Sequence, residues 1–175
     1  MSYDSSRTGV AYGGLRDAYD PRANPELFRG VLTARVMAVI IDVIVIAVPV
    51  VVATIFISIF GLVTLGLGWL LFWPLSGAAT VWAVLYYGLT LGGPHSATLG
   101  MRAMGIEMRT LSGAPAYFVL GAAHAVLYWI SVSMLTPFIV LIGLFNARGR
   151  LLHDFILGAV VINGPARAAR FTYRR

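Results

Sequence analysis

The sequence contains no cysteine and no lysine, and it has few charged residues of any kind. Without cysteine there is no disulfide framework and no thiolate to serve as a nucleophile or metal ligand. All thirteen basic residues are arginines, and against seven acidic residues they give a net charge of +6. These arginines flank apolar segments and do not form one basic face, so the charge favours an anionic lipid surface over nucleic acid.

Charged residues make up only 11% of the chain, whereas 59% of its residues are hydrophobic. Water-soluble domains carry about 25% charged residues. A chain of 175 residues cannot bury this much apolar surface in a water-soluble core. The composition therefore predicts an all-α integral membrane protein with membrane lipid as a partner.

The polar residues gather at the two ends of the chain. Residues 1–27 are rich in Ser, Gly, Tyr, Arg and Asp without periodicity, which is typical of a disordered tail. We expect a disordered cytoplasmic tail over residues 1–27, a transmembrane domain over residues 28–162 and a basic tail over residues 163–175.

Three apolar stretches reach the length of about 20 residues that crosses a bilayer. They predict helices over about 34–59 and 67–91, followed by an apolar run over 116–145 that contains Pro137. The last run fits either one tilted helix or a helix and a short returning segment.

The positive-inside rule favours the returning segment. Arginines precede the first helix and follow the second, while the loop between these helices has no charge. A single crossing by 116–145 would place the C-terminal arginines outside, whereas a turn near 133–137 keeps them inside. We therefore predict three full transmembrane helices plus a short fourth or re-entrant membrane segment, with both termini in the cytoplasm.

The polar loop over 92–115 should lie on the cytoplasmic membrane surface. Its segment Ile106-Glu107-Met108-Arg109 alternates apolar and charged residues, as a short strand does. Ser112-Gly113 supplies a turn, after which the chain from Ala114 can return as a second strand. We expect a small amphipathic loop or β-hairpin here.

Arg35 and Asp42 interrupt the first apolar helix. Their spacing of seven residues is about two helical turns, so both lie on one face. A carboxylate in a membrane helix costs about 2.5 kcal/mol or more, and Asp154 adds a second carboxylate if the C-terminal segment is on the same side. We expect Arg102, Arg150, His153 or a proton to meet the excess negative charge. The cluster is either a structural ion-pair network or an ion or proton site.

The three histidines offer little support for a metal. No His pair stands at helical spacing and cysteine is absent, so we expect no metal from His95, His124 and His153. His153 beside Asp154 is expected to titrate near neutral pH. No nucleophile–base pair is evident, so the sequence predicts neither an enzyme nor a cofactor.

Three blocks resemble the RDD family of small bacterial membrane proteins, named for one arginine and two aspartates. The first is Arg35 to Asp42, the second is Thr98-Leu99-Gly100-Met101-Arg102-Ala103-Met104-Gly105, and the third is Leu152-His153-Asp154 with the later Gly158. The similarity covers about residues 28–162. Met101 stands where the family often has lysine, and Ala159 where it often has threonine.

The resemblance implies a polytopic protein of the bacterial inner (plasma) membrane, with cation or proton-coupled transport suggested for some members. Two functions remain open. One is an accessory or assembly subunit of a larger membrane complex. The other is a small cation or proton-coupled transporter that works as an oligomer through Arg35, Asp42 and Asp154. Three or four helices barely enclose a transport site, so both need other subunits or self-association. Small residues would allow such contacts: Gly61, Gly66, Gly68, Gly77, Ala78 and Ala79.

Overall fold

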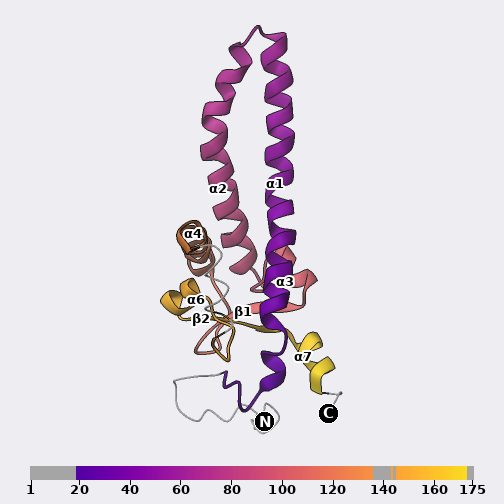
Figure 1. Cartoon of the computed structure of the whole chain (residues 1–175), viewed down its shortest axis with the longest axis vertical. Coiled ribbons are helices and arrows are strands. Elements are labelled where there is room, and N and C mark those ends of the chain that lie inside the picture. Colours follow the sequence, from indigo (N-terminus) through magenta and orange to yellow (C-terminus); the bar gives the residue numbers. More distant parts are fainter. Residues whose placement is uncertain (1–18, 136–142, 144, 173–175) are drawn as a thin grey trace, which may run out of the picture.

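A computed structural model describes residues 19–135, 143 and 145–172. Two long helices dominate it: α1 (Val31–Val63) and α2 (Phe72–Leu91), with the 3-10 turn η3 (Leu67–Leu71) just before α2. They run side by side as a helical hairpin along the long axis of the molecule (Figure 1). Residues 25–63 and 67–91 are each long and apolar enough to cross a membrane. The two predicted helices are thereby confirmed, and α1 extends beyond both predicted ends.

Most of the hairpin is not covered by any other described part of the chain. Only 11% of the most apolar window in the first stretch and 6% in the second are buried inside the structure. The buried residues near the start of α1 recur at helical spacing and define one face that meets the rest of the chain: Val31, Ala34, Arg35, Ala38 and Asp42. Beyond them the helix exposes Val, Ile and Phe side chains, as expected of helices that face lipid.

At the tip of the hairpin, Gly61 makes room for the side chain of Trp69. A Cβ on Gly61 would lie 1.8 Å from the ring of Trp69, so only glycine admits the indole at this point. The Trp69 Nε1 atom donates to the carbonyl oxygen of Ser58 at 3.2 Å. Gly61 therefore serves packing within the hairpin.

All the remaining elements gather at the other end of the hairpin and form what we call the head (Figure 1). They are η2 (Pro25–Leu27), α3 (Leu99–Ala103), β1 (Ile106–Thr110), α4 (Phe118–Leu135), α6 (Leu152–Leu157), β2 (Ala159–Asn163) and α7 (Pro165–Thr172). The predicted basic tail over 163–175 thus includes the helix α7, which lies close to η2.

The predicted strand at 106–109 is confirmed as β1, but its predicted partner is wrong. β1 pairs antiparallel with β2, so that Ile106 lies opposite Asn163 and Thr110 opposite Ala159. The segment from Ala114 contributes only an isolated bridge between Arg109 and Pro115. All five residues of β2 are buried. β2 is apolar and fully buried, whereas the segment after β1 is a short polar turn, so pairing with β2 gives β1 a partner strand in the core.

The predicted third full span is not confirmed. The apolar part of α4, Phe118–Met134, is shorter than the two long stretches. Figure 1 shows α4 nearly end-on beside the lower part of α2, so its axis runs steeply inclined to the hairpin. The two helices approach closely, because a Cβ on Gly88 would lie 2.7 Å from the Phe118 ring and one on Gly121 2.8 Å from Leu91 Cβ. Most of the predicted returning segment lies outside the described residues.

Candidate functional site

Arg35 and Asp154 form a buried ion pair in the head. Arg35 Nη1 on α1 lies 2.5 Å from Oδ2 of Asp154 on α6, and these side chains are 9% and 0% exposed. The same Nη1 donates to the carbonyl oxygen of Gly149 at 3.0 Å. Asp154 Oδ2 also accepts from the backbone N–H of Leu151 at 2.9 Å. Asp154 thus caps the first turn of α6 while it binds α6 to the membrane helix.

The ion pair keeps Asp154 ionised. Burial alone raises the pKa of its carboxyl group, but the guanidinium of Arg35, followed by His124 and His153, outweighs burial and lowers the pKa to about 2. Above that pH the group is a carboxylate. It therefore remains an acceptor and a possible cation ligand throughout the physiological range.

Asp42 is held by neutral donors. Its Oδ1 accepts from the Tyr86 hydroxyl at 2.6 Å and from the Gly100 N–H at 2.8 Å. Its Oδ2 accepts from the Thr98 hydroxyl at 2.6 Å. The carboxylate is only 2% exposed, and these three donors replace the water that it lost.

The predicted cluster of three charges is therefore two separate sites, which corrects the expectation that both carboxylates share Arg35. Among the described residues, Arg35 and Asp42 do not approach within ion-pair distance. The two side chains share one face of α1 but stand two turns apart. At that separation Arg35 meets α6, whereas Asp42 meets α2 and α3.

The predicted supporting residues have different positions. Arg150 Nη2 donates to the main-chain oxygen of Asp154 at 2.7 Å, and its guanidinium lies 4.2 Å from the centre of the Phe155 ring. His153 Nε2 lies 3.6 Å from Asp154 Oδ1. Arg102 is exposed and makes no ion pair within the described ranges, so the expectation that it balances the carboxylates is wrong.

His153 does not titrate near neutral pH as predicted. Burial, the largest cause, lowers the pKa of its imidazole to about 4, against an opposing effect of Asp154 and with a smaller contribution from Arg35. The residue is 1% exposed. Its imidazole is therefore neutral at physiological pH and has a nitrogen lone pair to offer.

The loop motif over 98–105 packs the head against α1. Thr98 Oγ1 accepts from the backbone N–H of Met101, which caps α3, while its proton goes to Asp42. A Cβ on Gly100 would lie 2.1 Å from the carbonyl oxygen of Ala38. Gly105 and Gly158 have φ values of +67° and +61°, which favour glycine. The motif thus has turn and packing roles.

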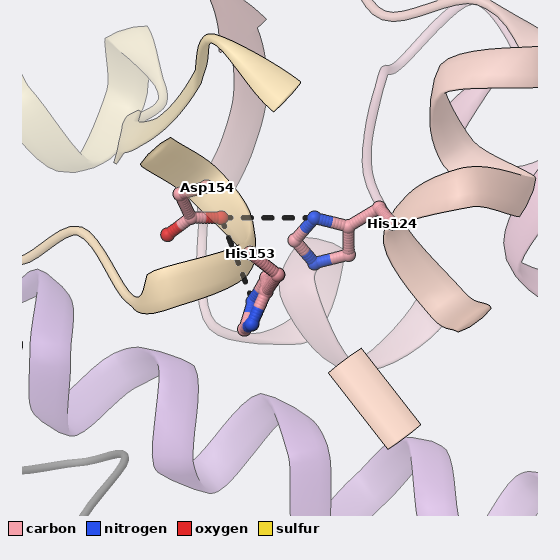
Figure 2. Close-up of side chains that lie close together, drawn as sticks. All are labelled: His124, His153 and Asp154. Atoms are coloured by element: carbon pink, nitrogen blue, oxygen red, sulfur yellow. Dashed lines mark ion pairs between the residues drawn. The ribbon is translucent and has the colours of Figure 1, made fainter. Parts of the chain in front are cut away.

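The sequence did not predict that two further residues, Tyr86 and His124, lie beside the carboxylates. The hydroxyl group of Tyr86 on α2 donates to Asp42. His124 on α4 places its Nδ1 3.6 Å from Asp154 Oδ1, beside His153 (Figure 2). Neither contact has a local sequence signal, because the partners come from different helices. His95, by contrast, is exposed.

A cavity joins the two sites. It has a volume of about 300 Å³, and the polar groups that line it include Arg35, Asp42, Thr98, His124 and His153. Most other lining residues are apolar, among them Leu91 and Val161. This arrangement can hold a small polar or cationic species beside Asp42 and the two histidines.

The chain matches the sequence profile of the RDD family over residues 29–158. No curated protein and no solved structure matches it. The matched range contains Arg35, Asp42 and Asp154, as well as the loop motif that packs against α1. It also contains the whole of α1 and of the second stretch that is able to cross a membrane. The match covers well over half of the chain, from Arg29 just before α1 to Gly158 at the end of α6, and this chain therefore belongs to the RDD family.

Proposed function

We propose that this protein is an accessory or assembly subunit of a larger complex in the bacterial inner membrane. The observation that carries the proposal is the division of the molecule into an almost uncovered apolar hairpin and a head that contains the buried charges. Two spanning helices cannot enclose a path across a bilayer. The hairpin is suited to anchoring the head and to contacting helices of other subunits.

Distribution of charge supports a cytoplasmic head. The described arginines belong to the head or to the segments beside it, whereas the hairpin tip has none. By the positive-inside rule the head and both chain ends face the cytoplasm. α4 then lies along the membrane surface, with these exposed apolar side chains towards lipid: Val119, Val126, Trp129, Ile130 and Met134.

One site on α2 fits a contact with another subunit. A Cβ on Gly77 would meet no atom within 4 Å, and Gly77 and Ala78 are exposed. Small residues let a second helix approach closely. In this proposal a helix of the companion subunit packs against α2 at Gly77.

Native purification tests this function. The protein is tagged in its own host, extracted in mild detergent and analysed by native mass spectrometry. We expect a companion membrane protein at fixed ratio, lost in Gly77→Leu and kept in Val52→Phe, a similar enlargement at an exposed position of α1. A homo-oligomer or a monomer without a companion would contradict the proposal.

The cavity favours a second candidate, a small cation or proton-coupled transporter. Asp42 and His124 line the same cavity, and ionisable groups at such positions are often functional. An oligomer would have to complete the path. Proteoliposomes with a pH gradient test this candidate: Asp42→Asn should abolish flux in protein that remains folded, and unchanged flux would remove Asp42 from the mechanism.

A further inference from the structure

We propose that His124, His153 and Asp154 bind a divalent transition-metal ion, for which zinc is the best fit. The three side chains come from α4 and α6 and point toward one another (Figure 2). Their candidate ligand atoms all lie within 4.8 Å of one another. This inference does not depend on whether the protein is an accessory subunit or a transporter.

The facing atoms are buried polar atoms without hydrogen-bond partners among the described residues. His124 Nδ1, His153 Nε2 and Asp154 Oδ1 have no such partner in the part of the chain that the structure describes. Asp154 is 0% exposed, His153 1% and His124 9%. Buried polar atoms nearly always have a partner. A bound cation would satisfy all three at once.

Ser131 orients His153 for this role. The Ser131 hydroxyl donates to the carbonyl oxygen of Leu127 at 2.7 Å, so its oxygen is free to accept from His153 Nδ1, which lies 3.4 Å away. A proton on Nδ1 leaves the lone pair on Nε2, directed at Asp154. Metal-binding histidines are usually held in this way by a partner on the other nitrogen.

The carboxylate has one oxygen left for a metal. Oδ2 of Asp154 is occupied by Arg35 and by the Leu151 N–H, whereas Oδ1 faces both imidazoles at 3.6 Å. Tetrahedral zinc with bonds of about 2.0–2.2 Å separates its ligand atoms by about 3.4 Å. Small side-chain rotations bring these donors to that spacing.

The ligand types select the metal. Two imidazoles and one carboxylate suit zinc, whereas magnesium and calcium prefer a shell of oxygens. The guanidinium of Arg35 lies beside the other oxygen of Asp154, Oδ2. Its positive charge disfavours cations that are held only by electrostatic attraction to the carboxylate. The cavity reaches both histidines and provides an entry path.

The test uses the full chain in detergent, with an affinity tag that contains no histidine. Protein treated with a chelator is titrated with Zn²⁺, and bound metal is measured by elemental analysis after dialysis. Co²⁺ serves as a spectroscopic probe of four-coordinate N/O ligation. We expect one equivalent per chain, and a fall in affinity of at least about 100-fold in His153→Gln and in His124→Gln.

His95→Gln is the matched control, because it removes the third and exposed histidine and should bind zinc as the unmodified protein does. His124→Gln keeps the test decisive if His153→Gln fails to fold, since His124 is at the edge of the site. Failure of the unmodified protein to retain zinc would overturn the proposal. Retention that is unchanged in His124→Gln would overturn it as well.

Discussion

Arg35 and Asp154 join the membrane hairpin to the last helix of the matched range through an ion pair between α1 and α6. Both groups are buried, and each has further hydrogen bonds to the backbone, Arg35 to Gly149 and Asp154 to Leu151. The ion pair is therefore part of a larger hydrogen-bond network that includes the backbone beside α6. It fixes how the head sits on α1.

Breaking this pair should destabilise the protein strongly. Removing one partner of a buried pair leaves the other charge uncompensated and costs about 3–5 kcal/mol. We expect Arg35→Gln and Asp154→Asn each to lower the melting temperature in detergent, and the double variant to lose less than the sum. Strictly additive losses would contradict a direct pair. Glu107→Gln is the control, because its more exposed pair with Arg109 should contribute about 1 kcal/mol or less.

Tyr86→Phe should reveal how Asp42 is stabilised. The variant removes the hydroxyl that donates to Asp42, and hydrogen bonds to charged groups contribute about 1.5–3 kcal/mol. Tyr117→Phe removes a hydroxyl from an exposed tyrosine and should leave the free energy of unfolding nearly unchanged. Equal stability of the two variants, measured by thermal unfolding, would show that the Tyr86 hydroxyl does not support Asp42.

Gly100→Ala should weaken the packing of the loop motif over 98–105 against α1 and thereby lower the stability of the protein. The added methyl group would lie 2.1 Å from the carbonyl oxygen of Ala38, and overpacking of this kind costs about 1–3 kcal/mol. Gly77→Ala is the control, because its methyl group meets open space and alanine favours helix. Thermal unfolding in detergent measures both, and a Gly100→Ala protein as stable as the control would contradict the close contact.

The pKa of His153 predicts a pH dependence of stability in metal-free protein. Burial lowers the pKa to about 4 in the folded state, against 6.5 for an unperturbed histidine. Between these values only the unfolded chain binds the proton, so stability should fall as the pH falls from about 6.5 to 4, by up to about 3 kcal/mol. Above pH 6.5 this group should have no effect.

His153→Gln should reduce the slope of the stability profile in that window without abolishing it, because burial also lowers the pKa of His124, to about 3, while His95→Gln should leave the slope in place. The profile is measured as melting temperature against pH in one detergent. A slope that persists unchanged in His153→Gln would assign the pH dependence to another group.

The absence of native cysteine makes the topology directly testable. Leu65→Cys at the hairpin tip, where the native residue is 96% exposed, should react with an impermeant thiol reagent on intact cells. Ala169→Cys on α7, also at an exposed position, should react only after the cells are permeabilised. Labelling of Ala169→Cys from outside would contradict a cytoplasmic head.

Composition and hydropathy determined the two long helices, because lipid-facing helices need uninterrupted apolar residues wherever they pack. Local spacing likewise identified Arg35, Asp42 and the strand at 106–109, while the loop glycines were identified by the resemblance to the RDD family. These features are short-range, so a pattern within a few residues is enough to predict them.

Only the tertiary structure decided which groups meet. Arg35 could have paired with either carboxylate, and the rotation of α1 against α6 and α3 assigned it to Asp154. The same packing brought Asp42 within hydrogen-bond distance of Tyr86 and Thr98, and it placed β2 beside β1. His124 reached Asp154 because α4 lies beside the lower part of α2, steeply inclined to the hairpin. Such contacts join residues far apart in the chain, and their free energy depends on burial and geometry that no local pattern records.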